Sequence, residues 1–198
     1  MISLVDGTLA LRDPAGIVIA TAGGVGYAVE VPLGVFERLP ALGSKVQLHT
    51  ELVVREDAWA LYGFDTLLER AVFRRLMGAS GVGARIALAM LSALGPDRTV
   101  RAIREKDLAV LSSVPGIGKK KAERLVLELA DRLDDLPVSS GSSAGAAGSP
   151  SADAVRALSA LGYPAAAAET AVRNAIEQGT TLETAALVRR ALTDLTRT

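Results

Sequence analysis

The stretch "SSVPGIGKKKAERLVLEL", from Ser112 to Leu129, decides the fold of the region around it. Two glycines flank an apolar residue, and three lysines follow at the start of a segment with helical periodicity. The pattern is not a nucleotide-binding P-loop, because Ser113 stands where that motif needs its first glycine and Lys120 where it needs Ser or Thr. We interpret the stretch as a hairpin between two helices, with an anion site at the start of the second helix.

A second copy of this device lies 35 residues earlier, where Gly81 aligns with Gly116 and Gly83 with Gly118. In each copy the glycines let a ligand approach the backbone, and the apolar residue between them fills the gap between the helices. One copy alone would be equally typical of a tight turn between helices. Two copies with a basic residue in register favour a repeating anion, such as the phosphates of a nucleic-acid backbone. The candidate phosphate-binding residues are Gly81, Gly83, Arg85, Gly116, Gly118, Lys119, Lys120 and Arg124.

The charge distribution supports this interpretation, although the whole chain of 198 residues has a net charge of zero. Residues 66–132 carry 13 basic and 7 acidic side chains, a net charge of +6. Residues 1–65 have a net charge of −4 and residues 133–198 one of −2. The cationic surface is therefore expected on the segment that contains both hairpins.

Residues 1–64 are predicted to form an OB-like β-barrel. Short segments with alternating β-branched residues are separated by glycine-rich turns, and a five-stranded barrel of this length closes its own edges. The run Gly24-Val25-Gly26 is not a dinucleotide fingerprint, since Val29 replaces the third glycine and no helical pattern follows. We interpret it as a hairpin turn.

The rest of the chain is predicted to be helical, which makes this an α+β multi-domain protein. Residues 65–136 form the tandem helix-hairpin-helix α domain, with apolar residues on one helical face. Residues 137–152 are rich in Ser, Gly, Ala and Pro, and predict a flexible linker. Residues 153–198 predict a small three-helix, UBA-like bundle, which we expect to be tethered by the linker rather than docked.

The composition excludes several kinds of function. The chain has no Cys and one His, which excludes disulfides and thiol catalysis and argues against a metal site or a catalytic triad. No apolar run approaches the roughly 18 residues of a membrane span, and the N-terminus lacks the pattern of a secretory signal. We expect a cytoplasmic protein without a cofactor or metal.

At the level of whole motifs, the chain resembles the RuvA family, the Holliday-junction-binding subunits of a bacterial branch-migration machine. The resemblance covers the whole chain, and its order of barrel, tandem hairpins, linker and small bundle is that of the family. Its motifs are "LVVREDAWALYGFD" (52–65), "LPALG" (39–43), "GVGARIALAMLSAL" (81–94), "VPGIGKKKAERL" (114–125) and "ALGY" (160–163).

The resemblance implies a non-catalytic homotetramer that presents one concave face to a four-way DNA junction, and it leaves open a tetramer or an octamer on DNA. Glu56 and Asp57 would form an acidic pin where the four arms meet. The C-terminal bundle would engage RuvB, an AAA+ ATPase motor, through Leu158, Leu161 and Tyr163. The RuvC resolvase is a further partner that the resemblance implies.

Two other functions fit part of the sequence. A DNA glycosylase also uses such a hairpin with a lysine and a downstream aspartate, but Asp131, Asp134 and Asp135 precede the linker and no aromatic-rich segment offers a flipped base a stacking surface. A non-specific DNA-binding scaffold module would use the barrel as its binding surface. The net charge of −4 on residues 1–65 argues against phosphate binding there.

Overall fold

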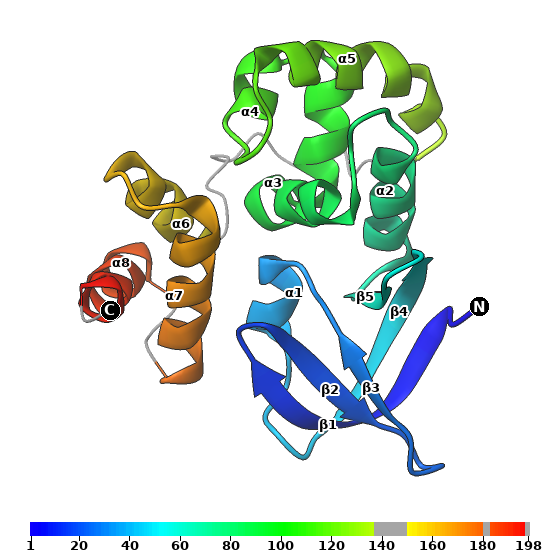
Figure 1. Cartoon of the computed structure of the whole chain (residues 1–198), viewed down its shortest axis with the longest axis vertical. Helices are drawn as coiled ribbons and strands as arrows, with labels where there is room; N and C mark the ends of the chain where they lie inside the picture. The colour runs from blue at the N-terminus through cyan, green and yellow to red at the C-terminus, as the bar shows by residue number, and fades with distance from the viewer. Residues whose placement is uncertain (137–149, 180–182, 197–198) are drawn as a thin grey trace.

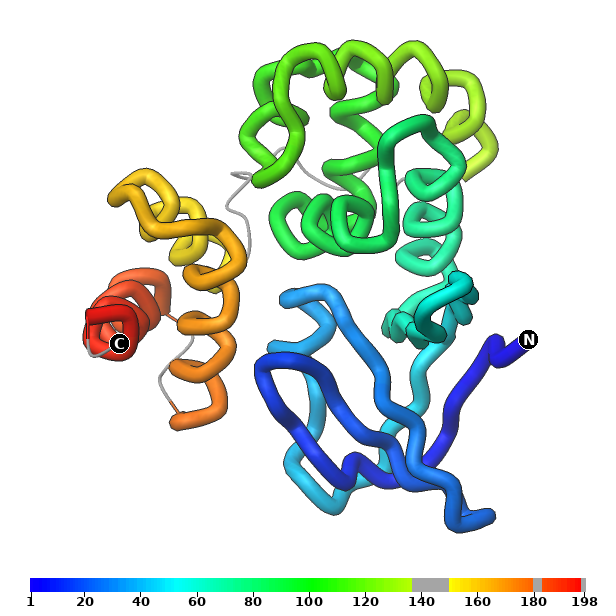
Figure 2. Tube along the Cα trace, in the orientation of Figure 1, coloured from blue at the N-terminus to red at the C-terminus, as the bar shows by residue number. Residues whose placement is uncertain are grey.

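The computed structural model describes residues 1–136, 150–179 and 183–196. Figure 1 shows the barrel at one end, the tandem helical region at the other, and the C-terminal helices beside both. Figure 2 follows the same path along the backbone. The barrel strands are β1 (Leu4–Asp13), β2 (Gly16–Ala20), β3 (Gly26–Val29), β4 (Lys45–Val54) and β5 (Trp59–Phe64), with the short helix α1 (Leu33–Arg38) between β3 and β4.

The five strands form one antiparallel sheet in the order β3-β2-β1-β4-β5. The sheet curls until its two edges approach, and Glu30, just after β3, forms a parallel bridge with Tyr62 of β5. Apolar side chains on alternate positions of each strand point inward, as in β2, where Ile17 and Ile19 are buried. The predicted OB-like barrel is confirmed, and Gly24-Val25-Gly26 lies at the turn from β2 to β3.

The helical region begins with α2 (Leu67–Met77), which starts with a capping box. The Thr66 hydroxyl accepts a hydrogen bond from the Glu69 amide, and the Glu69 carboxylate accepts one from the Thr66 amide. The remaining elements are α3 (Ala84–Arg104), α4 (Leu108–Ser112), α5 (Lys119–Leu129) and the 3-10 turn η1 (Asp131–Leu133). The helix α3 is kinked at Gly95 and Pro96, where Gly95 leaves the helical conformation.

The C-terminal bundle consists of α6 (Pro150–Ala160), α7 (Ala165–Glu177) and α8 (Thr184–Leu195). Of the predicted linker, 137–152, residues 137–149 lie outside the described residues. Its last three residues belong to α6, where Ala152 is buried, so helix formation starts earlier than the composition predicts. A proline suits the first turn of a helix, where its missing amide donor costs nothing.

The bundle is docked on the barrel, which corrects the expectation that it is tethered only. Arg173 of α7 is almost fully buried, donates a hydrogen bond to the Val31 carbonyl over 2.8 Å, and stacks on the Phe36 ring. Arg12 of β1 also stacks on that ring and forms an ion pair of 2.6 Å with Glu177 at the end of α7. Because the barrel and the bundle share one hydrophobic core cluster, they pack as one unit.

Candidate nucleic-acid interface

Two hairpins with nearly the same backbone connect α2 to α3 and α4 to α5. Gly81 and Gly116 have φ values of +77° and +85°, a conformation that a residue with a Cβ rarely adopts. Gly83 and Gly118 then cap α3 and α5 with extended backbone, at φ values of −91° and −85°. The repeat seen in the sequence is therefore a repeat in three dimensions.

The hydrogen bonds repeat as well. The Val82 amide bonds the Ala79 carbonyl over 3.1 Å, and the equivalent Ile117 amide bonds the Val114 carbonyl over 3.0 Å. Val82 and Ile117 are both buried, as the predicted plug between the helices requires. The first amides of each following helix have no acceptor within their own helix, so both hairpins present backbone donors at a positive dipole end.

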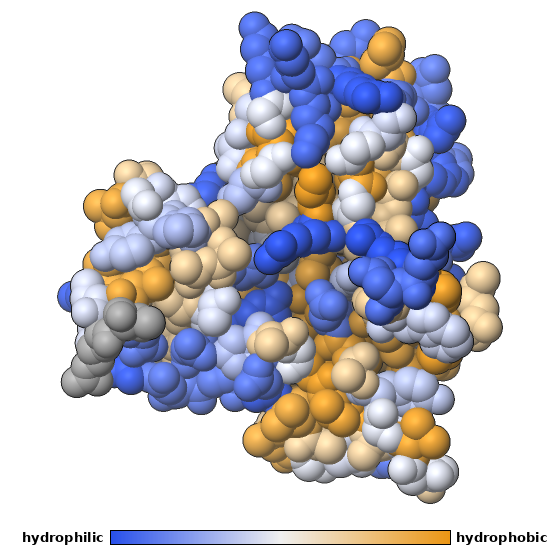
Figure 3. All heavy atoms as spheres, in the orientation of Figure 1, coloured by the Kyte–Doolittle hydropathy of each residue, from blue (hydrophilic) through white to orange (hydrophobic). Residues whose placement is uncertain are grey.

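The second hairpin carries the larger positive charge. Lys119 and Lys120 are exposed at the start of α5, and hydrophilic side chains cover much of the region of α4 and α5 in Figure 3. Lys121 instead folds back, and its Nζ donates a hydrogen bond to the Gly116 carbonyl over 3.0 Å. Arg124 is paired with Glu128, with Nε and Oε1 2.7 Å apart, so its charge is partly neutralised.

Glu128 also links the two hairpins. Its second carboxylate oxygen accepts a hydrogen bond of 2.7 Å from the Ser80 amide, next to Gly81. The hydrogen bond from Ser80 and the neighbouring Arg124 guanidinium hold the pKa of the Glu128 carboxyl below its ordinary value. The spacing between the two anion sites is therefore held by a direct contact between α5 and the first hairpin.

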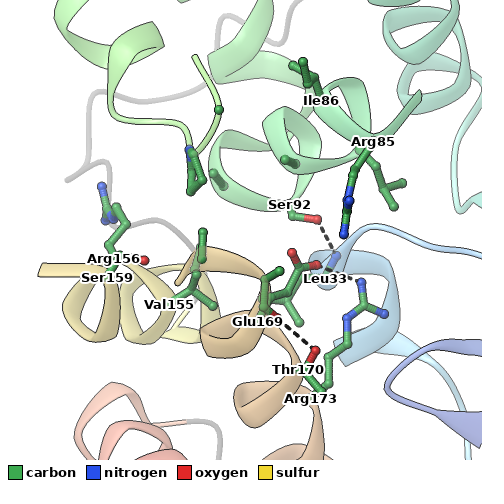
Figure 4. A pocket seen from close by; sticks show the side chains of 18 of the residues that line it. Leu33, Arg85, Ile86, Ser92, Val155, Arg156, Ser159, Glu169, Thr170 and Arg173 are labelled. Carbon is green, nitrogen blue, oxygen red and sulfur yellow. Dashed lines mark hydrogen bonds and ion pairs between the residues drawn. The ribbon is translucent and has the colours of Figure 1, made fainter. Parts of the chain in front are cut away.

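The first hairpin has a different environment. Arg85 lies in the first turn of α3 and extends into a seam between the barrel, the hairpins and the bundle (Figure 4). The seam contains a cavity of about 650 Å³, whose lining includes Arg85, Gly116, Glu30, Glu169 and Arg173. Burial raises the pKa of the Glu30 carboxyl above its ordinary value, while Arg173 and Arg85 oppose the shift. Arg85 therefore shares this cavity with two carboxylates, those of Glu30 and Glu169.

The predicted acidic pin is the turn between β4 and β5. Glu56 and Asp57 are exposed there, and the turn is closed by a hydrogen bond of 2.9 Å from the Arg55 amide to the Ala58 carbonyl. The structure brings this turn to the first hairpin, because a methyl group added to Gly83 would lie 3.3 Å from Nη2 of Arg55. Sequence reasoning missed Arg55, although its place directly before the two carboxylates was a usable signal.

The three predicted partner-binding residues differ in accessibility. Leu158 is fully buried in the core cluster that the bundle shares with the barrel. Leu161, in contrast, is 62% exposed at the corner between α6 and α7. Tyr163 is partly exposed at the same corner. Of the three, only Leu161 and Tyr163 offer a surface to another molecule.

The described residues contain neither a metal site nor a membrane-spanning helix. Over the ranges 1–136, 150–179 and 183–196, no group of three or more His, Asp or Glu side chains is arranged to hold a metal ion. Over the same ranges, no helix combines the length and apolarity that crossing a membrane requires.

Comparison with known proteins decides the family. Residues 1–63 match the model of the RuvA N-terminal domain, residues 73–131 a SAM-like helix-hairpin-helix tandem, and residues 149–195 the RuvA C-terminal domain. A protein of Gemmatimonas aurantiaca is 52% identical to the chain, and the match covers 99% of each sequence.

The chain belongs to the RuvA family. Other relatives are proteins of Laribacter hongkongensis, 47% identical over 100% of both chains, and of Halorhodospira halophila, 46% identical over 97% of this chain and 96% of the relative. Each of the three is named as a Holliday junction branch migration complex subunit RuvA. The RuvA N-terminal match includes the turn between β4 and β5 and ends within β5.

Proposed function

We propose that this protein binds four-way (Holliday) DNA junctions by their backbone phosphates and serves branch migration. The observation that carries the proposal is the pair of hairpins with matching dihedral angles and matching hydrogen bonds. Backbone amides at two helix starts fit phosphates and read no base sequence. The names of the relatives, which are branch migration complex subunits, support the same function.

The proposed assembly is a homotetramer. The two hairpins of one chain hold about one duplex backbone, so four arms need four copies related by closed symmetry. The mass of the complex in solution distinguishes one tetramer from two on each junction. Because the substrate is cellular DNA, the proposed location is the cytoplasm.

In this proposal the chain does no catalysis, and its partner RuvB, an AAA+ ATPase, supplies the energy for branch migration. Leu161 and Tyr163 form the proposed contact with the motor, since both have accessible apolar surface at one corner of the bundle. RuvC, a resolvase, is the proposed further partner on the same junction. A Leu161→Asp variant should then bind junctions normally and fail to stimulate the motor.

Glu56 and Asp57 are proposed to act by charge alone. Eight carboxylates, two from each of four chains, would surround the crossover and repel phosphates from its centre. This repulsion would keep duplex backbone out and help strands separate as they pass between arms.

The decisive experiment is a gel-shift panel with equal lengths of four-way junction, plain duplex, mismatched duplex and single strand. The proposal expects strong preference for the junction, with little change when the arm sequences are scrambled. Solution mass with and without the junction gives the stoichiometry. Preference for a mismatched duplex, or equal binding to all four DNAs, would support a glycosylase-like or a non-specific module instead.

A further inference from the structure

The two hairpins differ at the first residue of the helix that follows. In the second hairpin this residue is Lys119, which is exposed at the start of α5. In the first hairpin the equivalent residue is Ala84, which is 2% exposed and belongs to a core cluster that includes Tyr62 of β5. A lysine at position 84 would have to bury its charge, so the first hairpin has no room for the cation that the second one carries.

A cation from the barrel lies at this position instead. Arg55 follows β4, and its Nη2 atom lies 3.3 Å from the place where a Cβ of Gly83 would be. Gly83 is the residue that caps α3, so the guanidinium stands beside the amides that begin this helix. The residue is far from the hairpin in sequence and close to it in the fold.

This placement leaves a concentration of positive charge without a partner. A helix start carries about half a positive elementary charge, and a guanidinium beside it is repelled unless an anion lies between them. Within the part of the chain that the structure describes, the Arg55 side chain is in no ion pair with a carboxylate. Arg85, the other cation of this hairpin, extends toward the acidic side chains of the seam (Figure 4).

We propose that Arg55 is the phosphate-binding cation of the first hairpin and does there what Lys119 does in the second. The inference rests on the proposed function, since the anion is a phosphate of the DNA backbone. A guanidinium suits the task because its planar donors can bond a phosphate in pairs while the Gly83–Arg85 backbone amides bond it from the other side.

The same residue fixes the position of the pin. Arg55 precedes Glu56 and Asp57 directly, and its amide closes their turn. A phosphate held between Arg55 and the first hairpin therefore places the two carboxylates at a set distance from the DNA backbone. Binding and repulsion at the crossover are then two properties of one short turn.

The test compares full-length Arg55→Gln and Arg55→Lys with a matched control, Lys45→Gln. Lys45 is an exposed cation at the first residue of β4, whereas Arg55 directly follows the last, so the control gives the same change of charge at the other end of this strand. Binding of a four-way junction and of a plain duplex is measured by fluorescence anisotropy from low to high salt. Thermal unfolding of each variant checks the fold.

Arg55→Gln should weaken junction binding several-fold and lower the salt slope by about 0.9 for each phosphate that is no longer neutralised. Lys45→Gln should change neither quantity. Arg55→Lys should restore most of the salt slope but only part of the affinity, because an ammonium lacks the paired donors. The lysine variant decides the question alone if the glutamine variant does not fold.

Equal slopes and affinities for Arg55→Gln and Lys45→Gln, with junction preference intact, would overturn the role of Arg55 and leave the proposed function standing. Absence of junction preference in the wild-type chain would overturn the proposed function instead. In a second arm, Glu56→Gln with Asp57→Asn should alter the junction-to-duplex ratio less in the Arg55→Gln background than in the wild type. Full additivity of the substitutions would show that Arg55 does not position the pin.

Discussion

The first and second hairpins place equivalent glycines at φ values of +77° and +85°. The first hairpin is nevertheless packed against the barrel, whereas the second exposes the start of its helix to solvent. The open hairpin carries its own lysines, and the packed one has a buried alanine in place of the first lysine and an arginine from the barrel turn beside it. Backbone geometry is set locally, by glycines and a buried plug. The charged side chains at each hairpin depend on which positions the rest of the fold leaves accessible to solvent.

The largest expected effect comes from removing the charge of the open hairpin. Lys119→Ala with Lys120→Ala should weaken binding to every DNA, about ten- to a hundredfold near 0.1 M salt, and lower the salt slope by about 0.9 for each phosphate that is no longer bound. Anisotropy titrations at several salt concentrations measure both. The control is Lys45→Ala, an exposed cation on the barrel, which should leave binding unchanged. An unchanged slope in the double variant would mean that these lysines bind no phosphate.

The next effect tests whether the polypeptide backbones of the two hairpins are equivalent. Gly81→Ala and Gly116→Ala should each lower the free energy of unfolding by about 1–2 kcal/mol, because a Cβ disfavours positive φ. No atom lies within 4 Å of either added methyl group, so the cost comes from the backbone conformation alone. Thermal or denaturant unfolding measures it. Gly118→Ala, at a negative φ and also in open space, is the control and should cost clearly less.

A smaller effect concerns the pin, which lies beside the packed hairpin. Glu56→Gln with Asp57→Asn should tighten binding to plain duplex several-fold and reduce the preference for junctions, because phosphates are no longer repelled. Gel shifts with both DNAs give the ratio. Asp6→Asn with Asp13→Asn, exposed acidic residues elsewhere on the barrel, should leave the ratio unchanged. Weaker duplex binding in the pin variant would make the turn an ordinary solvated loop.

The features that could be predicted from the sequence are those that depend on residues close together along the chain. The barrel strands, both hairpins and the helix breaks follow from local patterns such as the spacing of Gly81 and Gly83. The docking of the bundle did not follow, because Arg12, Phe36 and Arg173 are far apart in the sequence and none is unusual alone. A segment rich in Ser and Gly indicates freedom to move, but it contains no information about the surface on which the next domain rests.

The burial of Ala84 is a second limit of the sequence. Alignment of the repeats puts Ala84 opposite Lys119, and the sequence alone shows only that the first hairpin lacks a charge there. In the fold, β5 and α3 belong to one core cluster that includes Ala84. Only the three-dimensional packing shows that the position is closed and that Arg55 lies beside it. The roles of the site residues therefore follow from which side chains share a surface, and this depends on packing between domains.

The smallest expected effect concerns Glu30, which faces Arg85 of the packed hairpin and Arg173 of the bundle. Burial is the main cause that raises its pKa above the ordinary 4.5, so the folded chain binds a proton at Glu30 more readily than the unfolded chain does. This contribution to stability is fully present below 4.5 and is lost as the pH rises through the raised pKa. Glu30→Gln should therefore gain thermal stability relative to the wild type as the pH rises from about 4 to 7.

The same substitution should slightly tighten DNA binding at neutral pH. It removes a carboxylate that attracts Arg85, and it leaves Lys119 and Lys120 of the open hairpin untouched. The gain should be small, about twofold or less, since Glu30 is partly solvated and its field is screened by salt. Thermal midpoints of the two proteins across pH, together with anisotropy at one low salt concentration, check both expectations. A stability difference that does not vary with pH would show that Glu30 binds protons equally in the folded and unfolded chains, and weaker DNA binding would show that it holds Arg85 in place for the phosphate.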